Sequence, residues 1–299
     1  MKILVTADIH DDNRQARGLP VIEGGAGILA SADMLIVAGD LANDPERNWP
    51  GALERLSRLI EPERIWVIPG NHDYYRFRLD GDDRLAEIAA RAGVNFAQKT
   101  AIEADGLRLL LCTLWTDFDV VGDRDMMMIG AGLMMNDYHR IGWRDGDTLR
   151  RMLPADTLAM HQAEAAWLMA ALDRPFDGKT LVMTHHLPAP ELLAPEAGKG
   201  EYAPAYVSDL RDGLLGKRID AWITGHTHWA KRGTLEGAHG PIAFLANMMG
   251  YAGQFTNFEP YRVLDMNAPC LGLKPLEVDD RDLIHGLREK GNPAPAITF

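Results

Sequence analysis

The stretch Ile65-Trp-Val-Ile-Pro-Gly-Asn-His-Asp73 carries an apolar run straight into three polar residues. The run Ile65–Ile68 is typical of a strand that is buried on both faces of a parallel sheet. Asn71 can offer a carbonyl oxygen to a cation, His72 can bind metal or move a proton, and Asp73 can orient an imidazole. A Pro-Gly turn followed by Asn and Asp is also typical of an ordinary loop. The other strands of the chain decide between these two interpretations.

Four further apolar runs end in residues that can ligate a metal. They are Ile3–Ala7 with Asp8 and His10, Met34–Ala38 with Asp40, Thr180–Thr184 with His185 and His186, and Ala221–Thr224 with His226 and His228. Ligand sites of open α/β sheets lie beyond the carboxyl ends of the strands, so we expect these side chains to gather at one edge. Residues two apart in an extended exit point to the same side, which would make each Asp-x-His or His-x-His pair converge.

The donor atoms of this set indicate transition metals. Nitrogen and oxygen ligands without thiolate suit Zn, Mn, Fe or Ni better than Ca or a structural zinc site. The ligands are too many for one ion. Two divalent or trivalent ions about 3.5–4 Å apart, with Asp40 as the bridge, would use them all and would stabilise the attacking and leaving oxygens of a displacement at phosphorus.

Five motifs occur in order along the chain: Asp-x-His, Gly-Asp, Gly-Asn-His-Asp, His before a proline, and Gly-His-x-His. Together they resemble the calcineurin-like metallophosphoesterase superfamily over about residues 2–250. The resemblance implies an α/β fold, a four-layer αββα sandwich with a dimetal site on top. It implies two metal sites that share one residue: Asp8, His10, Asp40 and His228 for the first, and Asp40, Asn71, His185 and His226 for the second. The choice of His185 over the adjacent His186 depends on strand geometry.

The same resemblance implies the chemistry. The expected reaction is hydrolysis of a phosphoester by in-line attack of a metal-bound hydroxide on phosphorus. His72 would face the scissile phosphate and would stabilise or protonate the leaving oxygen, while Asp73 behind it would fix its tautomer. Phosphomonoesters and phosphodiesters both fit, as small molecules or nucleotides. The segment Ala246-Asn-Met-Met-Gly-Tyr251 departs from the Asn-Pro-x-Gly-Tyr pattern of the family, which puts only a contact at the rim of the site in doubt.

Residues 1–275 are expected to form the metallophosphoesterase domain, with an insertion at about residues 116–152 and a peripheral tail at 276–299. The insertion breaks the alternation of strands and helices, and it looks like that of an uncharacterised bacterial subgroup of the superfamily. One interpretation is a lid in which Asn136, Tyr138 and His139 touch substrate. The other is a surface excursion that uses Met as core filler.

Several scaffold elements are also predicted. We expect a helix that starts at Asn48, a helix over Arg84–Ala92 that ends at Gly93, and a helix over Thr157–Leu172 whose apolar stripe makes His161 a hydrogen-bonded core residue. The runs Phe96–Ala104 and Leu107–Trp115, joined by Asp105-Gly106, indicate a hairpin. Further strands are expected at Pro241–Ala246 and Tyr261–Met266.

Composition restricts the partners. The chain has 299 residues, of which 46% are hydrophobic and 25% charged, and its formal charge is -12. With a pI of about 5.3 it offers no sequence-wide basic field, which disfavours extended nucleic acids and membrane surfaces. The family resemblance implies a small phosphoester as the partner. Two cysteines make no disulfide framework. No signal peptide or membrane-length apolar run is evident, so a cytoplasmic protein is expected.

Two rival functions fit the sequence less well. A dimetal amide or lactam hydrolase also uses His-x-His, but here the pair comes late and is followed by Trp229-Ala230 rather than by Asp-His. A non-catalytic metallophosphoesterase-like binding scaffold would be expected to have lost ligands, whereas this sequence has every one.

Overall fold

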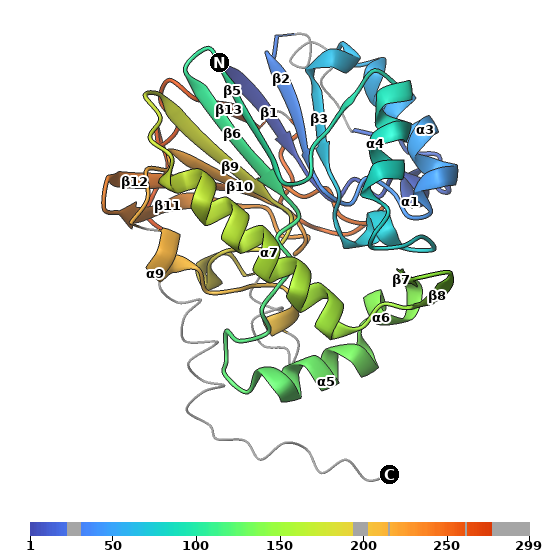
Figure 1. The fold of residues 1–299 in the computed structure, drawn as a ribbon. Coiled ribbons are helices and arrows are strands. Elements are labelled where there is room, and N and C mark those ends of the chain that lie inside the picture. The colour runs from blue at the N-terminus through green and yellow to red at the C-terminus, as the bar shows by residue number, and fades with distance from the viewer. Residues whose placement is uncertain (23–30, 194–202, 215, 261, 277–299) are drawn as a thin grey trace.

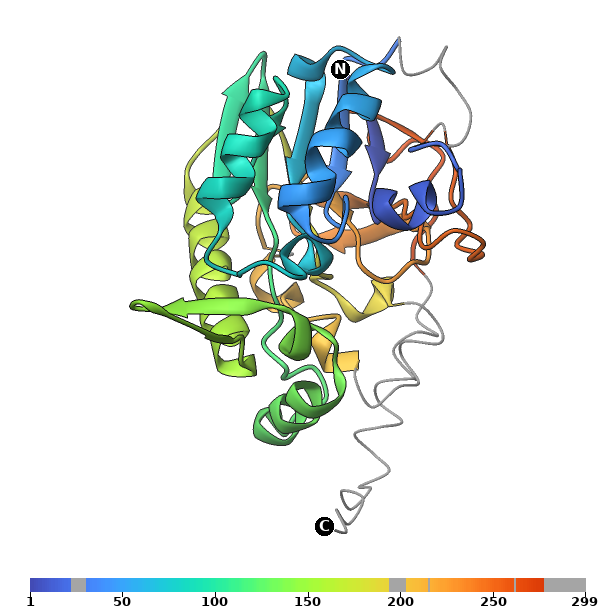
Figure 2. The same ribbon diagram turned by 90° about the vertical axis from the view of Figure 1, so that its right-hand side faces the viewer.

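The fold consists of two β-sheets that pack face to face, with helices on both outer faces (Figures 1 and 2). The computed structural model describes residues 1–22, 31–193, 203–214, 216–260 and 262–276. Within them, α3 and α4 cover one sheet and α7 covers the other. The four-layer αββα sandwich expected from the sequence is confirmed.

The elements have the following bounds. The strands are β1 Lys2–Thr6, β2 Met34–Ala38, β3 Ile65–Ile68, β4 Asn95–Phe96, β5 Thr100–Ala104, β6 Leu107–Cys112, β7 Gly142–Asp145, β8 Thr148–Arg151, β9 Lys179–Thr184, β10 Ala221–Thr224, β11 Lys231–Gly237, β12 Gly240–Ala246 and β13 Val263–Asp265. The α-helices are α1 Asp11–Gln15, α3 Pro45–Ser57, α4 Asp82–Arg91, α5 Arg124–Met134, α6 Asp137–Arg140, α7 Pro154–Asp173 and α9 Arg211–Leu214. Short 3₁₀ helices lie at η1 Pro62–Arg64, η2 Asn71–Tyr74, η3 Pro190–Leu192 and η4 Ala203–Ala205.

Strand order brings the chemically capable strand ends together. The first sheet has the order β13-β1-β2-β3-β4, in which β1 to β4 are parallel and β13 is antiparallel to β1. The second has the order β11-β12-β10-β9-β6-β5, with a parallel centre and antiparallel edge strands. The carboxyl ends of β1, β2 and β3 therefore lie across from those of β9 and β10.

Period-two alternation along the strands builds the core. On β6, Leu109 faces the apolar layer between the two sheets, and Leu110 faces the layer beneath α7. On β2, Ile36 lies in the layer between the sheets, while Leu35 packs beneath α3 and α4. Both faces of these strands are buried, which is why the sequence shows continuous apolar runs.

Two predicted boundaries are wrong. Helix α3 begins at Pro45 rather than Asn48, because Pro45 is the first-turn proline and Pro50 lies inside the helix. The run Phe96–Ala104 is not one strand: Phe96 pairs with β3 in the first sheet, the backbone of Lys99 turns with a φ of 45°, and β5 starts in the second sheet. Edge strand β11, with exposed ends and a polar sequence, was not predicted.

Other scaffold predictions are confirmed. The hairpin turn at Asp105-Gly106 has φ values of 51° and 72°, as a type I′ turn requires. His161 is buried and bonds the carbonyl of Trp115 through Nδ1. The predicted tail lies outside the described residues except for Leu276, which packs beneath the second sheet.

The segment 116–152 is more regular than the sequence indicated. It contains α5, α6 and the hairpin β7–β8, and it lies below the sandwich in the view of Figure 1. Phe118, Tyr138, Ile141 and Met152 join the apolar cluster under α3 and α4, so the segment shares the core. Among the described residues no helix is both long enough and apolar enough to cross a membrane.

A buried carboxyl on α7 generates a prediction about stability. Glu164 is fully buried and accepts hydrogen bonds from the Trp115 N–H at 3.2 Å and from Gln98 Nε2 at 3.1 Å. Burial raises the pKa of Glu164 to about 8. The folded state therefore binds more protons than the unfolded state between about pH 4.5 and 8, and the free energy of unfolding should fall as pH rises through that window.

Urea denaturation of the wild type and of Glu164→Gln at pH 5.5 and 7.5 measures this effect. The wild type should lose on the order of 1–3 kcal/mol relative to the variant over that interval, because the amide does not titrate. The substitution can also change the free energy of unfolding by a constant amount through altered hydrogen bonds, but this does not affect the difference between the two pH values. Parallel pH profiles for the two proteins would contradict the prediction.

Candidate metal centre

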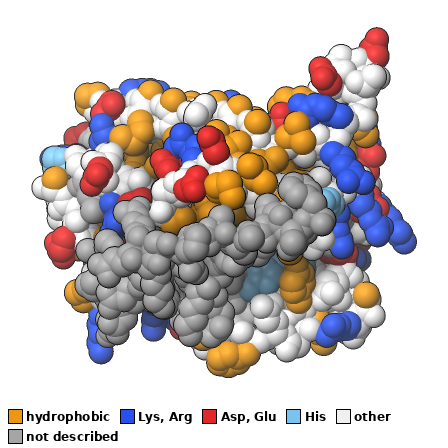
Figure 3. Space-filling view, turned by 90° about the horizontal axis from the view of Figure 1, so that it is seen from below, with side chains coloured by type: hydrophobic (Ala, Val, Ile, Leu, Met, Phe, Trp, Pro, Cys, Tyr) orange, Lys and Arg blue, Asp and Glu red, His pale blue; other side chains and the backbone are white. Residues whose placement is uncertain are grey.

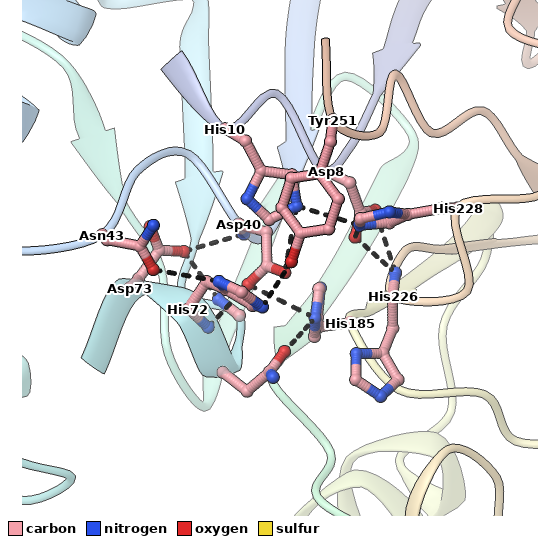
Figure 4. Close-up of polar contacts among 12 residues, drawn as sticks. Asp8, His10, Asp40, Asn43, His72, Asp73, His185, His226, His228 and Tyr251 are labelled. Carbon is pink, nitrogen blue, oxygen red and sulfur yellow. Dashed lines mark hydrogen bonds and ion pairs between the residues drawn. The ribbon is translucent and has the colours of Figure 1, made fainter. Parts of the chain in front are cut away.

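Seven of the sequence-predicted site residues meet at one edge of the sandwich, as Figure 4 shows for most of them. They leave the carboxyl ends of five strands, β1, β2, β3, β9 and β10. Two groups of ligand-type atoms form there, and Asp40 belongs to both.

The first group comprises Asp8, His10, Asp40 and His228, whose ligand atoms all lie within 4.8 Å of one another. His10 Nε2 is 2.9 Å from His228 Nε2 and 3.7 Å from Asp40 Oδ2. His228 Nε2 is 3.3 Å from Asp8 Oδ1. Two imidazole nitrogens and two carboxylates thus face a common point, which is the donor set that a borderline cation prefers.

The second group comprises Asp40, His185 and His226, again within 4.8 Å. Asp40 Oδ1 lies 3.6 Å from His185 Nε2, and Asn71 Oδ1 lies 3.0 Å from the same nitrogen. His185 Nδ1 donates to the Ala38 carbonyl at 2.9 Å, which leaves Nε2 as the ring atom without a proton. His186 is absent from this group, so the geometry selects His185 from the doublet.

The strand exits are not extended, and this part of the sequence reasoning is wrong. Left-handed backbone conformations occur at five of the converging residues: Asp8, His10, Asp40, His226 and His228, with φ values of 51°, 47°, 57°, 80° and 50°. Asp and His tolerate this conformation better than most residues, although it still costs about 1 kcal/mol or more for each. The side chains converge because the chain turns sharply, not because residues two apart share a face.

Two glycines make the close approach possible. A Cβ atom at Gly39, whose φ is 90°, would overlap the His185 ring, and one at Gly70 would overlap the Asp40 carboxylate. Glycine before Asp40 and before Asn71 therefore permits a crowded centre.

The electrostatics of the two groups fit cations. Burial, and next the nearby carboxylates of Asp8 and Asp73, raise the pKa of Asp40 well above its usual value. Burial also lowers the pKa of His10 and His226 far below the usual value. Within the described residues, neither Asp8 nor Asp40 has a Lys or Arg ion-pair partner. Neutral His10 and His226 beside buried carboxylates that lack a Lys or Arg partner make an environment that a bound cation completes.

An unsatisfied atom supports the same interpretation. His226 Nε2 is buried and has no hydrogen-bond partner in the described part of the chain. An orphaned imidazole nitrogen is costly unless something binds it, and a metal ion does so. The residues present therefore fit metal ions in both groups.

His72 lies beside the groups and has a defined tautomer. Asn43 Nδ2 donates to Asp12 at 2.8 Å, so the other amide atom, Oδ1, is the one that faces His72 Nδ1 at 2.9 Å. Nδ1 must carry the proton, and Nε2 is left as an acceptor. Burial, and next the positive charge of His228, lower the pKa of His72 to about 3, so its ring is neutral at pH 7.

Asp73 does not fix this tautomer, contrary to the prediction. Its buried carboxylate accepts from the backbone N–H groups of Asp40 at 2.8 Å, Ala42 at 3.0 Å and Gly70 at 2.8 Å, and from Trp49 Nε1 at 2.9 Å. These bonds join the turn after β2 to the turn after β3. Asp73 is therefore a structural residue, and Asn43 supplies the function that the sequence assigned to it.

Tyr251 is a site residue that sequence reasoning placed only at the rim. Its hydroxyl lies 3.2 Å from His72 Nε2, and its ring centroid lies 4.4 Å from that of His10 and 4.7 Å from that of His228 (Figure 4). Because His72 Nε2 accepts, the hydroxyl donates. The Gly250-Tyr251 pair at the end of the segment 246–251 was the sequence feature that could have identified Tyr251 as a site residue.

The three residues of the segment 116–152 that were predicted to touch substrate differ in exposure. Tyr138 is buried and its hydroxyl bonds Thr157 Oγ1 at 3.1 Å, and its contact with substrate stays a prediction. Asn136 and His139 are exposed, and His139 Nε2 bonds the Leu133 carbonyl at 3.0 Å; contact of these two with substrate stays a prediction.

Asp137, between these residues, is the one that reaches the centre. Its Oδ1 accepts from Asn71 Nδ2 at 2.8 Å and from the Tyr75 hydroxyl at 2.6 Å. The bond to Asn71 turns the amide so that Oδ1 faces His185. No pattern in the run Asn136–Arg140 distinguishes the residue that reaches the centre.

Comparisons with known proteins agree with this geometry. The sequence matches the family model of the calcineurin-like phosphoesterases over residues 1–230. It is 23% identical over 250 residues to an uncharacterised protein of Acanthamoeba polyphaga mimivirus, with 78% of this chain and 84% of that protein covered.

The fold resembles that of a solved structure. Phosphopantetheinyl hydrolase from Mycobacterium tuberculosis superposes with a TM-score of 0.59 at 16% identity, over 84% of this chain and 89% of the other. At this identity the likeness concerns the fold alone. A protein of Thermus thermophilus gives a TM-score of 0.46 at 12% identity, over 92% of this chain and 99% of the other.

The structural assignment of Asp73 yields a prediction. Asp73→Asn puts an NH₂ group against backbone donors, so the free energy of unfolding should fall by at least about 2 kcal/mol, since each buried donor left unpaired costs roughly 1–3 kcal/mol. Urea denaturation measures the loss. Asp83→Asn, at a carboxylate whose side chain is 80% exposed, is the matched control and should change little. Equal stability of both variants would show that Asp73 does not join the two turns.

Proposed function

Because this chain belongs to the calcineurin-like phosphoesterase family, we propose that it is a dimetal-dependent hydrolase of small phosphoesters. The proposed ligands share Asp40: Asp8, His10, Asp40 and His228 for the first ion, and Asp40, Asn71, His185 and His226 for the second. Mn, Fe, Zn or Ni suits this set of nitrogen and oxygen donors.

One observation carries the proposal. The two carboxylate oxygens of Asp40 point in different directions, Oδ2 toward His10 Nε2 at 3.7 Å and Oδ1 toward His185 Nε2 at 3.6 Å. A carboxylate that presents one oxygen to each of two ligand groups is suited to bridge two ions. Bound metal ions would supply the Lewis acidity that neutralises phosphoryl oxygens and lowers the pKa of the attacking water.

The protein residues would position the substrate and handle the proton. His72 Nε2 carries the free lone pair of the ring, and it faces the Tyr251 hydroxyl beside the two ligand groups. At this atom His72 would take or return a proton at a substrate oxygen. Asn43 keeps the opposite nitrogen protonated, and Tyr251 offers a hydrogen-bond donor to an oxygen that approaches His72.

A shared fold does not identify the substrate of this chain. The phosphopantetheinyl hydrolase shares 16% identity with this chain, so its substrate is not assigned here. Both monoesters and diesters of phosphate fit the proposed chemistry. The alternative is a non-catalytic binding scaffold of the same fold; the complete set of converging ligands favours the enzyme.

Metal analysis combined with activity assays tests the proposal. The purified protein, loaded with manganese, should contain about two ions per chain and should hydrolyse p-nitrophenyl phosphate, bis(p-nitrophenyl) phosphate or both. Asp40→Asn should lower the metal content of both sites and abolish activity, whereas Asp83→Asn should do neither. Two retained ions in Asp40→Asn would overturn the bridge, and an inactive protein with two bound ions would favour the scaffold.

A second set of variants separates proton handling from metal binding. His72→Ala should lower kcat by about 10²–10⁴ while metal content stays near the wild-type value, as expected for loss of a general acid or base. Asn43→Ala should show a smaller loss of the same kind, because the His72 tautomer is no longer held. Parallel loss of metal and turnover in His72→Ala would instead make His72 a ligand.

A further inference from the structure

We propose that Arg76, Arg140 and Arg144 form a subsite beside His72 that binds a second anionic group of the substrate. The inference rests on the proposed phosphoesterase function and narrows the substrate class. The substrate would be a phosphoester that carries a further phosphate or carboxylate.

Arg140 is connected to His72 through a single aromatic ring. The Tyr75 ring stacks on the His72 ring with a centroid distance of 4.2 Å and an interplanar angle of 24°. Arg140 Cζ lies 5.6 Å from the centroid of the same Tyr75 ring. Tyr75 is buried and its hydroxyl is held by Asp137, so this ring is a fixed support for the guanidinium group.

Arg76, the residue that follows Tyr75, lines a cavity of about 320 Å³ together with Arg144. The other lining residues are Phe77, Arg78, Asp147, Thr148 and Leu149. A cavity of this size accommodates a phosphate or carboxylate together with part of the carbon skeleton that bears it. The cavity lies between the turn after η2 and the hairpin β7–β8.

Backbone hydrogen bonds hold the two sides of this subsite together. The Arg76 N–H donates to the Arg140 carbonyl at 2.9 Å, the Gly142 N–H donates to the Phe77 carbonyl at 2.8 Å, and the Leu79 N–H donates to the Gly142 carbonyl at 2.9 Å. The turn that follows His72 is thereby attached to the segment from Arg140 to Gly142. The backbone positions from which the three guanidinium groups extend are therefore fixed relative to one another.

The charges at the subsite are uncompensated. Within the described residues, the side chains of Arg76, Arg140 and Arg144 form no ion pair with a carboxylate, whereas Arg78 pairs with Asp80 at 2.7 Å. Asp147 is the one unpaired acid in the cavity lining, and it is exposed. The subsite therefore keeps a net positive charge.

This local charge contrasts with the rest of the chain. The formal charge of the sequence is -12, and several arginines elsewhere, such as Arg58, Arg84 and Arg150, have carboxylate partners. Figure 3 shows Lys and Arg side chains gathered along the right-hand edge, the side on which α6, β7 and β8 lie in Figure 1. Guanidinium groups bind phosphate and carboxylate oxygens in pairs, which makes an oxyanion the matching ligand.

Paired substrates test the subsite with the manganese-loaded protein. Adenosine 3′,5′-bisphosphate is compared with adenosine 5′-monophosphate, and fructose 1,6-bisphosphate with fructose 6-phosphate, by phosphate release. The wild type should show a higher kcat/KM for the member with two phosphates. Arg140→Gln and Arg144→Gln should each raise KM for that member about tenfold, as expected for a charge-assisted hydrogen bond, and leave p-nitrophenyl phosphate hydrolysis unchanged.

Controls separate this inference from the proposed function. Arg151→Gln removes an exposed charge from the same hairpin, at a residue that neither lines the cavity nor lies over the Tyr75 ring, and it should leave the preference intact. Hydrolysis of p-nitrophenyl phosphate without any preference for bisphosphates would overturn the subsite but not the phosphoesterase. So would an equal effect of Arg140→Gln on all substrates.

If no substrate is hydrolysed, isothermal titration calorimetry with adenosine 3′,5′-bisphosphate tests whether the subsite binds a second anionic group. Binding to the metal-loaded wild type that weakens about tenfold in Arg140→Gln and not in Arg151→Gln would support the subsite. The absence of binding, or equal affinity in all three proteins, would overturn it. Binding of 3-phosphoglycerate distinguishes the two anions: weakening in Arg140→Gln means that the subsite accepts carboxylates, and unchanged binding restricts it to phosphates.

Discussion

The buried Asp73 carboxylate is the interaction on which the centre depends. It accepts four hydrogen bonds, three from backbone N–H groups of the turns after β2 and β3 and one from the Trp49 indole. Both turns carry proposed metal ligands, Asp40 on one and Asn71 on the other. A buried carboxyl group that accepts hydrogen bonds from four donors is rigid, and its bonds strengthen one another in a dry interior. Asp73 would not touch a metal ion or substrate itself, but it sets the positions of the proposed ligands Asp40 and Asn71.

The same arrangement has an electrostatic cost. Asp8, Asp40 and Asp73 are buried close together, and repulsion among them adds to the burial that raises the pKa of Asp40. Left-handed backbone at the strand ends adds conformational strain. Ions bound at the two groups would offset the repulsion, so the free energy of folding is coupled to the free energy of metal binding. Strain of this kind at strand ends is typical of sites selected for function rather than for stability.

Strand ends and ligand types were predictable because both depend on local sequence. Buried parallel strands give continuous apolar runs, and glycine before Asp40 and Asn71 marks close approach. The partners of those ligands were not predictable. Asn43 replaces Asp73 behind His72 because of a loop that packs only in the folded chain, and no spacing rule distinguishes the two. Asp137 is likewise one polar residue among several until the segment 116–152 docks.

The centre joins residues that are far apart in the chain. His10 and His228 touch across 218 positions, and Tyr251 covers both. Loops of that size close late, since the entropy of bringing the ends together opposes contact until most of the fold exists. During synthesis the first four strands can pair before the second sheet is made, but the donor atoms for a complete site are not present until His228 has left the ribosome. Binding of metal ions at both proposed sites would therefore be a late step of folding.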